Sequence, residues 1–512
     1  MNADSAAPAR THSRFPARAW IALLAVVLAL GFLGVRGIWD PDEGRYTNVA
    51  MNMLDSGDWI TPHRSEDVGH WTKPPLTYWA IAASVATFGR NPWAARLPSA
   101  LAFLLCTWLV WRGARRLVPG SEDTAALAFA TMALPFGASQ YITTDFVLAA
   151  CETLAMWAFV ESRFDAPSRT RRWLLLMWVG FALAFLTKGP PGLLPLIAIL
   201  AFDLLQPRGQ RRRIFDIGGL ALFVAIATPW FIAVVRANPG LSDYFIGDEV
   251  VNRVATDDFN RNGQWYGWLQ VYAPTLLLGT LPWTLALLRW ARRLPADVRG
   301  WWRNPQRRAG ERAWLFPTLW LLLPLLVFCI SRSRMPLYLL PLFPALALLV
   351  AMQRQREGRG LPDWRAIVAW AALLLALAAA TGFWKTHKDA SEWAQAIRER
   401  IPGTIDKVRF VEDMARYGLH VELGAQVEKL SMLPDPHAAR FNPVNDTDVA
   451  HALAGSDSRM AGNADPDALW ITKQENWPKV QARFTALGYR ALPQGTPYQK
   501  RILFRVVPAS GG

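Results

Sequence analysis

Long apolar segments alternate with short polar segments over the first three-quarters of the chain. Examples are AWIALLAVVLALGFLGV, WLLLMWVGFALAFLT, IGGLALFVAIATPWFIAVV, WLFPTLWLLLPLLVFCI and AIVAWAALLLALAAATGFW. Stretches of roughly 17 to 25 apolar residues match the hydrocarbon thickness of a bilayer, so the pattern predicts a polytopic α-helical membrane protein with about eleven spans. The first apolar segment is followed by the bulky sequence RGIWDPDEG instead of a small-residue cleavage site, which predicts a retained helix.

The alternation stops near Trp384. Beyond it, strand-like segments VRFVED, ALWIT and RILFRVV are interspersed with amphipathic segments such as WPKVQARFTALGY. We therefore expect two domains. Residues 1–384 form a transmembrane domain, and residues 385–512 form a small soluble α/β domain.

Basic residues are concentrated in every second loop. The chain carries 55 Lys and Arg against 40 Asp and Glu, a net charge of +15. The most basic loops lie at 112–116, 161–172, 206–213, 289–312 and 353–360. Because cytoplasmic loops carry the excess of Lys and Arg, the intervening loops and the C-terminal domain are predicted to lie on the opposite, non-cytoplasmic side of the membrane. This distribution explains the net charge without a nucleic-acid partner.

The first outer loop contains an acidic stretch, WDPDEGRYTNVAMNMLDSGDW, at residues 39–59. Helix capping explains part of it: Asp40 is an expected N-cap, Pro41 the first helical residue and Glu43 the capping-box partner. Apolar residues then recur at helical spacing, which predicts a helix lying flat on the membrane and ending at Gly57. Capping needs one carboxylate, and this loop has three beside Arg45, so we expect a functional role for at least one of them.

Other ionisable residues are predicted on the same membrane face. Lys73 precedes a second interfacial helix in HWTKPPLTYWAIAASVATF, Asp145 ends QYITTD, Lys188 opens KGPPG, and Arg334 and Tyr338 lie in SRSRMPLY. Singly, each is equally well explained as a helix end or a headgroup anchor. Together they indicate a site for a lipid-linked sugar phosphate, because cations replace the water around a phosphate and carboxylates hold sugar hydroxyl or amino groups.

Two classes of protein are compatible with this grouping, a transferase and a transporter of a lipid-linked molecule. A transporter typically has charged or broken helices near the middle of the bilayer and often a repeated half. Here the charges gather at one face and no internal repeat is visible, which favours the enzyme.

Seven motifs in collinear order carry a family resemblance: DPDEGRYTNVAMNMLDSGDWITP, WTKPPLTYWAIAASVATFGRNPWAARLPSAL, TTDFVLAACETLAMWAF, FLTKGPPGLLP, DYFIGDEVVNRVA, GTLPW and SRSRMPLYLLPLFPALALL. They resemble those of the aminoarabinose lipid A transferases, which are GT-C membrane glycosyltransferases related to protein O-mannosyltransferases. The C-terminal FVEDMARYGLHVELGAQVEKLSM resembles the soluble domain of that family.

The resemblance implies transfer of a sugar, 4-amino-4-deoxy-L-arabinose, from an undecaprenyl-phosphate carrier to lipid A or a related envelope acceptor at the outer face of the inner membrane. The alternative within the same fold is a hexose or mannose donor with a protein or another glycolipid as acceptor. The residues expected to carry the chemistry are Asp42, Asp145 and Glu43 as catalytic groups, Lys73, Arg253, Tyr338 and Arg334 at the carrier phosphate, and Arg45, Tyr46, Lys188 and Glu249 at the substrate. Neither a metal nor another cofactor is assigned.

One departure from the family pattern concerns the sugar. Many members have Phe-Glu-Lys-Pro where this chain has Trp71, Thr72, Lys73 and Pro74. An acid is therefore missing beside the lysine assigned to the carrier phosphate, which bears on the identity of the donor sugar and less on the carrier.

Overall fold

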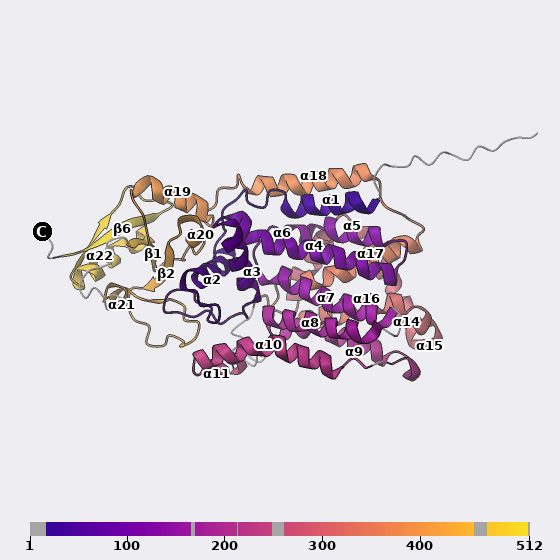
Figure 1. The fold of residues 1–512 in the computed structure, drawn as a ribbon. Coiled ribbons are helices and arrows are strands. Elements are labelled where there is room, and N and C mark those ends of the chain that lie inside the picture. The colour runs from indigo at the N-terminus through magenta and orange to yellow at the C-terminus, as the bar shows by residue number, and fades with distance from the viewer. Residues whose placement is uncertain (1–16, 165–168, 212, 248–260, 455–467, 510–512) are drawn as a thin grey trace, which may run out of the picture.

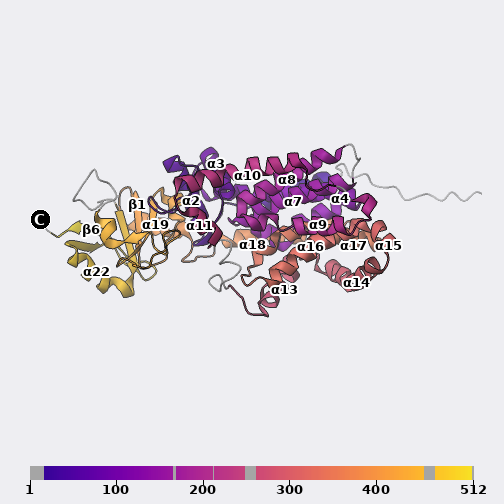
Figure 2. The ribbon, with the colours of Figure 1, turned by 90° about the horizontal axis from the view of Figure 1, so that it is seen from below.

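The computed structural model describes residues 17–164, 169–211, 213–247, 261–454 and 468–509. A long helical domain forms one part of the molecule and a mixed α/β domain the other (Figure 1). Figure 2 shows the same two parts after a turn of 90°, with α13 and α14 at one edge of the helical domain. The helical membrane-type architecture and the C-terminal sheet predicted from the sequence are both confirmed.

Six helical segments in the described part of the chain are long and apolar enough to cross a bilayer. They are α4 (Pro92–Leu117), α8 (Thr170–Lys188), α10 (Ile217–Ala237), α16 (Arg312–Ile330), η5 and α17 together (Pro336–Leu342 and Phe343–Arg356), and α18 (Trp364–Thr381). The pair α6 (Ala133–Ser139) and α7 (Thr144–Phe164) passes the same test but bends by 119°, and counts as a seventh if it is one broken span. The expected number of about eleven stays a prediction.

Other helical segments in the described part of this domain are shorter or less apolar. They are α1 (Ala17–Leu30), α2 (Asp42–Ser56), α3 (Leu76–Phe88), α5 (Glu122–Thr131), η2 (Pro190–Leu193), α9 (Leu196–Leu204), η3 (Arg208–Gln210), α11 (Leu241–Ile246), α13 (Gly267–Gly279), α14 (Thr284–Arg303) and α15 (Pro305–Gly310). Burial differs sharply among the long helices. Within the 18-residue apolar stretch of each helix, the buried share is 83% for η5–α17 but 22% for α10 and for α18. The exposed apolar faces of α10 and α18 are those expected of helices that contact lipid.

The first outer loop folds into the interfacial helix α2, but its start differs from the capping prediction. Gly57 ends the helix in the left-handed conformation (φ 71°), and its N–H donates to the carbonyl of Met53, as predicted. Asp40, however, is not the N-cap of α2. The N-cap position is taken by Pro41, which has no side-chain acceptor for a capping hydrogen bond. The Asp40 carboxylate instead accepts the N–H of Gly418, 3.2–3.3 Å away in the C-terminal domain. The predicted capping box is therefore wrong, because a long-range contact takes the acid.

The C-terminal domain is a six-stranded sheet between two layers of helices. Its elements are α19 (Ala390–Arg400), β1 (Lys407–Val411), α20 (Leu419–Leu423), β2 (Gln426–Ser431), β3 (Thr447–Asp448), α21 (Val449–Ala454), β4 (Ala468–Lys473), η6 (Gln474–Asn476), α22 (Trp477–Ala486), β5 (Tyr489–Pro493) and β6 (Arg501–Pro508). The strand order is β3-β2-β1-β4-β6-β5, with β1 parallel to β2 and β4, and β6 antiparallel to β4 and β5.

Alternating side chains of the central strands supply the two cores of this domain. Val408 and Phe410 of β1 pack with Trp393 of α19 on one face. Val411 of β1 and Trp470 of β4 pack with the residues of α22 on the other. Because helices cover both faces of the sheet, β1 and β4 are buried along nearly their whole length.

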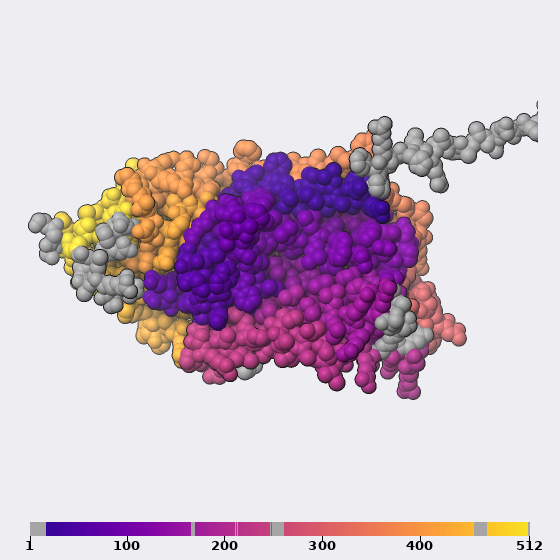
Figure 3. Space-filling view, viewed as in Figure 1, coloured from indigo at the N-terminus to yellow at the C-terminus, as the bar shows by residue number. Residues whose placement is uncertain are grey.

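The sheet domain contacts the outer loop of the helical domain closely. Figure 3 shows the segment that carries α2 and α3 lying directly against the C-terminal domain. Two backbone hydrogen bonds join the parts: the N–H of Asp40 donates to the carbonyl of Lys388 (2.8 Å), and the N–H of Ala390 donates to the carbonyl of Ile38 (2.9 Å). Gly44 is required at this contact, since a Cβ there would lie 1.8 Å from an Asp40 oxygen and 2.7 Å from the nitrogen of Gly418. The docked domain thus fixes where α2 begins.

Candidate functional site

Three of the predicted site residues meet where α7, α8 and η5 come together. Asp145, in the first turn of α7, forms an ion pair with Lys188, the last residue of α8. The Lys188 ammonium also lies 4.5 Å from the centroid of the Tyr338 ring, a cation–π contact. Both members of the ion pair are largely buried, with side-chain exposures of 10% and 12%. These residues are 43 to 193 positions apart in sequence, so the fold gathers them.

A second charged pair lies on α2. Arg45 donates to the Asp42 carboxylate at 2.8 Å, one helical turn away, and half of the Asp42 side chain is exposed. The charges of both pairs act on Tyr46 of α2. Burial raises the pKa of the Tyr46 phenol, the charge of Asp145 adds to the rise, and the cations Arg45 and Lys188 oppose it. Because all these charges act on one hydroxyl, Tyr46 links the Asp42 pair to the Asp145 pair.

Glu43 has very different surroundings from its neighbour Asp42. Its side chain is completely buried. Its two oxygens accept hydrogen bonds from the guanidinium groups of Arg36 and Arg96 and from the backbone nitrogens of Trp39 (3.0 Å) and Ile142 (3.1 Å). Burial alone would raise the pKa of Glu43, but the two arginines outweigh it and lower the pKa to about 2. This carboxylate joins the first outer loop to α4 and to the start of α7.

Lys73 lies in the loop before α3, beside an unusual pair. Its ammonium donates to the carbonyl of Thr72 at 2.6 Å. The Thr72 hydroxyl is 2.8 Å from Nε2 of His70, a residue that is 1% exposed. Burial lowers the pKa of His70 well below its ordinary value, and the positive charges of Arg45, Arg64 and Lys73 lower it further. A neutral imidazole–hydroxyl pair therefore stands where the family pattern has a carboxylate.

The remaining predicted residues are placed elsewhere or lie outside the described part. The guanidinium of Arg334 donates to the carbonyls of Asn262 (2.7 Å), Gln264 (2.7 Å) and Cys329 (2.9 Å), so it holds a loop together. Arg334 is 4% exposed. Arg253 and Glu249 fall within 248–260, outside the described residues.

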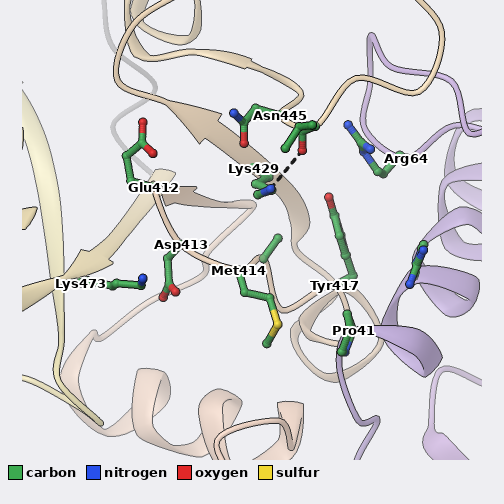
Figure 4. A pocket seen from close by; sticks show the side chains of 12 residues that line it. Pro41, Arg64, Glu412, Asp413, Met414, Tyr417, Lys429, Asn445 and Lys473 are labelled. Atoms are coloured by element: carbon green, nitrogen blue, oxygen red, sulfur yellow. Dashed lines mark hydrogen bonds between the residues drawn. The ribbon is translucent and has the colours of Figure 1, made fainter. Parts of the chain in front are cut away.

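A cavity of about 500 Å³ opens between α2, the loop that follows it and the C-terminal sheet. Pro41, Arg45 and Arg64 line it from the helical domain, and Glu412, Asp413, Tyr417, Lys429 and Lys473 are among the lining residues of the sheet domain (Figure 4). Arg45 belongs to both this cavity and the Asp42 pair. The cavity therefore lies next to the predicted catalytic acid.

Sequence reasoning missed the residues that hold the site in place. Arg96 is fully buried inside α4 although it sits in an otherwise apolar segment, and that isolated charge was the available signal. Glu152, 3% exposed and seven residues after Asp145 on α7, is a second buried ionisable residue in an apolar helix. In the described part of the chain, no group of three or more His, Cys, Asp or Glu side chains is arranged to hold a metal ion.

Comparison with known proteins finds relatives of this chain by sequence and by fold. Residues 72–232, which include Lys73, Asp145 and Lys188, match the family described as dolichyl-phosphate-mannose-protein mannosyltransferase. An undecaprenyl phosphate-alpha-4-amino-4-deoxy-L-arabinose arabinosyl transferase of Edwardsiella ictaluri is 33% identical over 343 residues, which are 66% of this chain and 59% of that protein. Its namesake from Pseudomonas aeruginosa (strain UCBPP-PA14) is 34% identical over 351 residues, covering 66% and 60%. The matches thus span about three-fifths of the length of these curated relatives.

A solved structure extends the likeness to nearly the whole chain. ArnT from Cupriavidus metallidurans, crystallised with undecaprenyl phosphate, superposes with a TM-score of 0.73 at 20% identity, covering 97% of this chain and 99% of that one. The fold is therefore the GT-C fold of membrane glycosyltransferases, with a C-terminal sheet domain. Within that class, the resemblance to the undecaprenyl phosphate–aminoarabinose arabinosyl transferases is confirmed by sequence and by fold.

Proposed function

We propose that this protein transfers 4-amino-4-deoxy-L-arabinose from an undecaprenyl-phosphate carrier to lipid A at the outer face of the inner membrane. The observation that carries the proposal is the cluster of Asp145, Lys188 and Tyr338 beside the Asp42–Arg45 pair. It combines a buried cation, a partly exposed one, two acids and a phenol on one side of the helical domain, which is what a lipid-linked sugar phosphate requires. The names of the relatives and the carrier bound by ArnT support the same substrate class.

The chemistry is a single displacement at the anomeric carbon. An oxygen of the acceptor attacks this carbon, the bond to the carrier phosphate oxygen breaks, and undecaprenyl phosphate leaves with the electron pair. Lys73 and, by the resemblance, Arg253 stabilise the charge of the leaving phosphate. If the acceptor is a lipid A phosphate, it is already a nucleophile and Asp42 orients it. If the acceptor is a hydroxyl, Asp42 accepts its proton.

The structure favours different roles for two residues first assigned to chemistry. Glu43 uses both of its oxygens to bind Arg36, Arg96 and two backbone nitrogens. We therefore propose that Glu43 is a positioning residue that holds α2, and with it Asp42, in place. Arg334 spends its donors on three carbonyls, so we propose that it shapes the loop before η5 instead of binding the carrier phosphate.

The domain division and the orientation follow from the same proposal. The last long apolar helix, α18, ends at Thr381, and the first helix of the sheet domain, α19, begins at Ala390. This supports a membrane domain over 1–384 and a periplasmic domain over 385–512. The basic loops then face the cytoplasm, and the site faces the periplasm.

Lipid A from a strain that lacks its own transferase, but still makes the donor, tests the proposal. Expression of the wild-type chain should produce aminoarabinose-modified lipid A, detected by mass spectrometry, with resistance to polymyxin. Asp42→Asn keeps the shape of the side chain but removes its charge, and it should reduce the modified fraction more than tenfold at equal protein level. Lys73→Ala should do the same through weaker carrier use. Unmodified lipid A with wild-type protein in the membrane would refute the proposal.

A neutral hexose donor is the second candidate, and the His70–Thr72 pair favours it. A cationic amino sugar gains from a nearby carboxylate, whereas this position offers a hydroxyl and a neutral imidazole. Thr72→Glu distinguishes the two donors. If the natural donor is a hexose, the variant gains aminoarabinose transfer that the wild type lacks. If the wild type already transfers aminoarabinose, the second candidate is rejected.

A further inference from the structure

The cavity between the two domains lies at a characteristic position of the C-terminal sheet. From β1 the chain adds β2 and then β3 on one side, and it later places β4 on the other side of β1. The strand order therefore reverses between β1 and β4, which are parallel. In open α/β sheets, ligands bind in the crevice outside the carboxyl ends of the strands at such a switch point.

The residues that line the cavity come from those carboxyl ends. Glu412 and Asp413 directly follow β1, Lys473 is the last residue of β4, and Lys429 lies near the end of β2. Figure 4 shows these four side chains around one opening, with Arg64 approaching from the helical domain. On the side of the helical domain the crevice is bordered by Pro41 and Arg45, which flank the predicted catalytic acid Asp42 in sequence.

Basic side chains outnumber acidic ones in the lining of the crevice. Arg45, Arg64, Lys429 and Lys473 line it together with two acids, Glu412 and Asp413. Arg45 and Arg64 are paired with Asp42 and Asp446, and Lys473 lies 3.5 Å from the exposed carboxylate of Glu475. Asp413 is 5% exposed and is engaged by Arg416 (3.0 Å) and Arg501 (2.9 Å), so it is neutralised from behind. Burial and the charge of Arg64 lower the pKa of Lys429, and the acids Asp446 and Glu412 offset only part of this shift. Its ammonium donates to the carbonyl of Val444 at 3.1 Å, and an added anion would favour the charged form further.

Glu412 adds an independent sign of a site. Its φ is +49°, the left-handed conformation that non-glycine residues seldom adopt. Its carboxylate accepts the N–H of Met432 at 2.8 Å, and the residue is exposed at the mouth of the crevice. Strained conformations of this kind cluster at ligand sites, and a carboxylate here is suited to sugar hydroxyls.

We propose that this crevice, bounded by Lys429, Lys473 and Glu412, binds the phosphate-bearing saccharide headgroup of the acceptor lipid and presents it to Asp42. The lysines contact phosphate, and Glu412 contacts hydroxyl or amino groups of the saccharide. This inference rests on the proposed function for the identity of the acceptor. It extends that function by giving the C-terminal domain a direct share in acceptor recognition.

A kinetic test uses the purified full-length protein with saturating donor and a titration of lipid A. Lys429→Ala combined with Lys473→Ala should raise the acceptor KM at least tenfold, leave kcat within about twofold and leave the donor KM unchanged. Lys479→Ala is the matched control, since Lys479 is an exposed lysine of α22 outside the cavity lining. An unchanged acceptor KM in the double variant would overturn the proposal.

A binding test separates this inference from the proposed function. Glucosamine 1-phosphate at millimolar concentration should raise the melting temperature of the wild type and of Lys479→Ala, but not of the double variant. Glucosamine alone should have no effect on any of them. If the phosphosugar result holds while wild-type protein transfers nothing to lipid A, the proposed acceptor fails and the crevice stands. Equal stabilisation by inorganic phosphate, or stabilisation that persists in the double variant, would overturn the assignment to a saccharide headgroup.

Discussion

Asp42 and Glu43 are neighbours on α2, but their surroundings differ. This difference indicates a catalytic role for Asp42 and a structural role for Glu43. Asp42 is half exposed and paired with a single arginine, which leaves it accessible to a substrate. Glu43 is completely buried between Arg36 and Arg96. A buried carboxylate with two guanidinium partners is costly to disturb, because the removal of one partner leaves the other charge unpaired. Glu43 therefore supports the fold around Asp42.

The pKa of Glu43 gives a prediction for stability. Its pKa falls from the ordinary 4.5 to about 2 on folding. The charged form is thus favoured in the folded state, and the stabilisation is present above pH 4.5 and is lost as the pH falls toward 2. The shift corresponds to about 3 kcal/mol. Glu43→Gln should accordingly melt at a lower temperature at pH 7, and the gap to the wild type should narrow as the pH falls from 4.5 toward 2.

Intrinsic tryptophan fluorescence of detergent-solubilised protein measures this gap. The control is Glu399→Gln, whose side chain is 58% exposed on α19 and should leave the melting temperature nearly unchanged. A gap that stays constant down to pH 2 would show that the Glu43 carboxylate does not supply the stabilisation.

At the scale of elements, the ends of α7 and α8 meet through the Asp145–Lys188 pair. Asp145 lies in the first turn of α7, and Lys188 is the last residue of α8. Such a pair holds two helices together, and it also holds two charged groups ready for a substrate. The Tyr338 ring against Lys188 gives the same cation a third neighbour from η5.

Single and double variants separate these two roles. Asp145→Asn and Lys188→Met should each lower both the melting temperature and the rate of transfer. The double variant leaves no unpaired charge, so its melting temperature should recover most of the loss. Its rate should stay at least 100-fold below the wild type, a barrier increase of about 2.7 kcal/mol. Recovery of the rate together with the stability would mean that the pair is only structural.

Elements were predicted best where the signal was local. The strand-like segments VRFVED and ALWIT predicted β1 and β4, and Gly57 predicted the end of α2. The start of α2 was predicted wrongly, because Asp40 bonds to Gly418, 378 residues away, and no local pattern reveals such a partner. The same reason hid the role of Glu43, whose partner Arg96 lies 53 residues away.

For the whole molecule, orientation in the membrane decides whether the site can meet its substrates. The basic loops predict that the C-terminal domain and the charged cluster face the periplasm. An alkaline phosphatase fusion after residue 400 should be active, and a fluorescent protein at the same position should be dark. Fusions within the basic loop at 353–360 should behave in the opposite way. An inactive phosphatase after residue 400, with an active one in that loop, would invert the membrane orientation assigned to the site.

The two domains act as one unit in this account. The sheet domain contacts the start of α2 through Asp40 and Gly418, and its crevice opens beside Arg45. The sequence predicted the soluble domain but did not indicate its function. Its position follows from contacts such as Arg64 with Asp446 (2.7 Å), which join residues 382 positions apart and are visible only in the folded molecule.

Transfer by the purified full-length protein tests the central claim most directly. The protein is incubated with undecaprenyl-phosphate-linked 4-amino-4-deoxy-L-arabinose and lipid A, and both products are quantified by mass spectrometry. We expect aminoarabinose-modified lipid A and undecaprenyl phosphate in equal amounts, and neither product with Asp42→Asn. Release of undecaprenyl phosphate without modified lipid A, or no reaction by well-folded wild-type protein, would contradict the central claim.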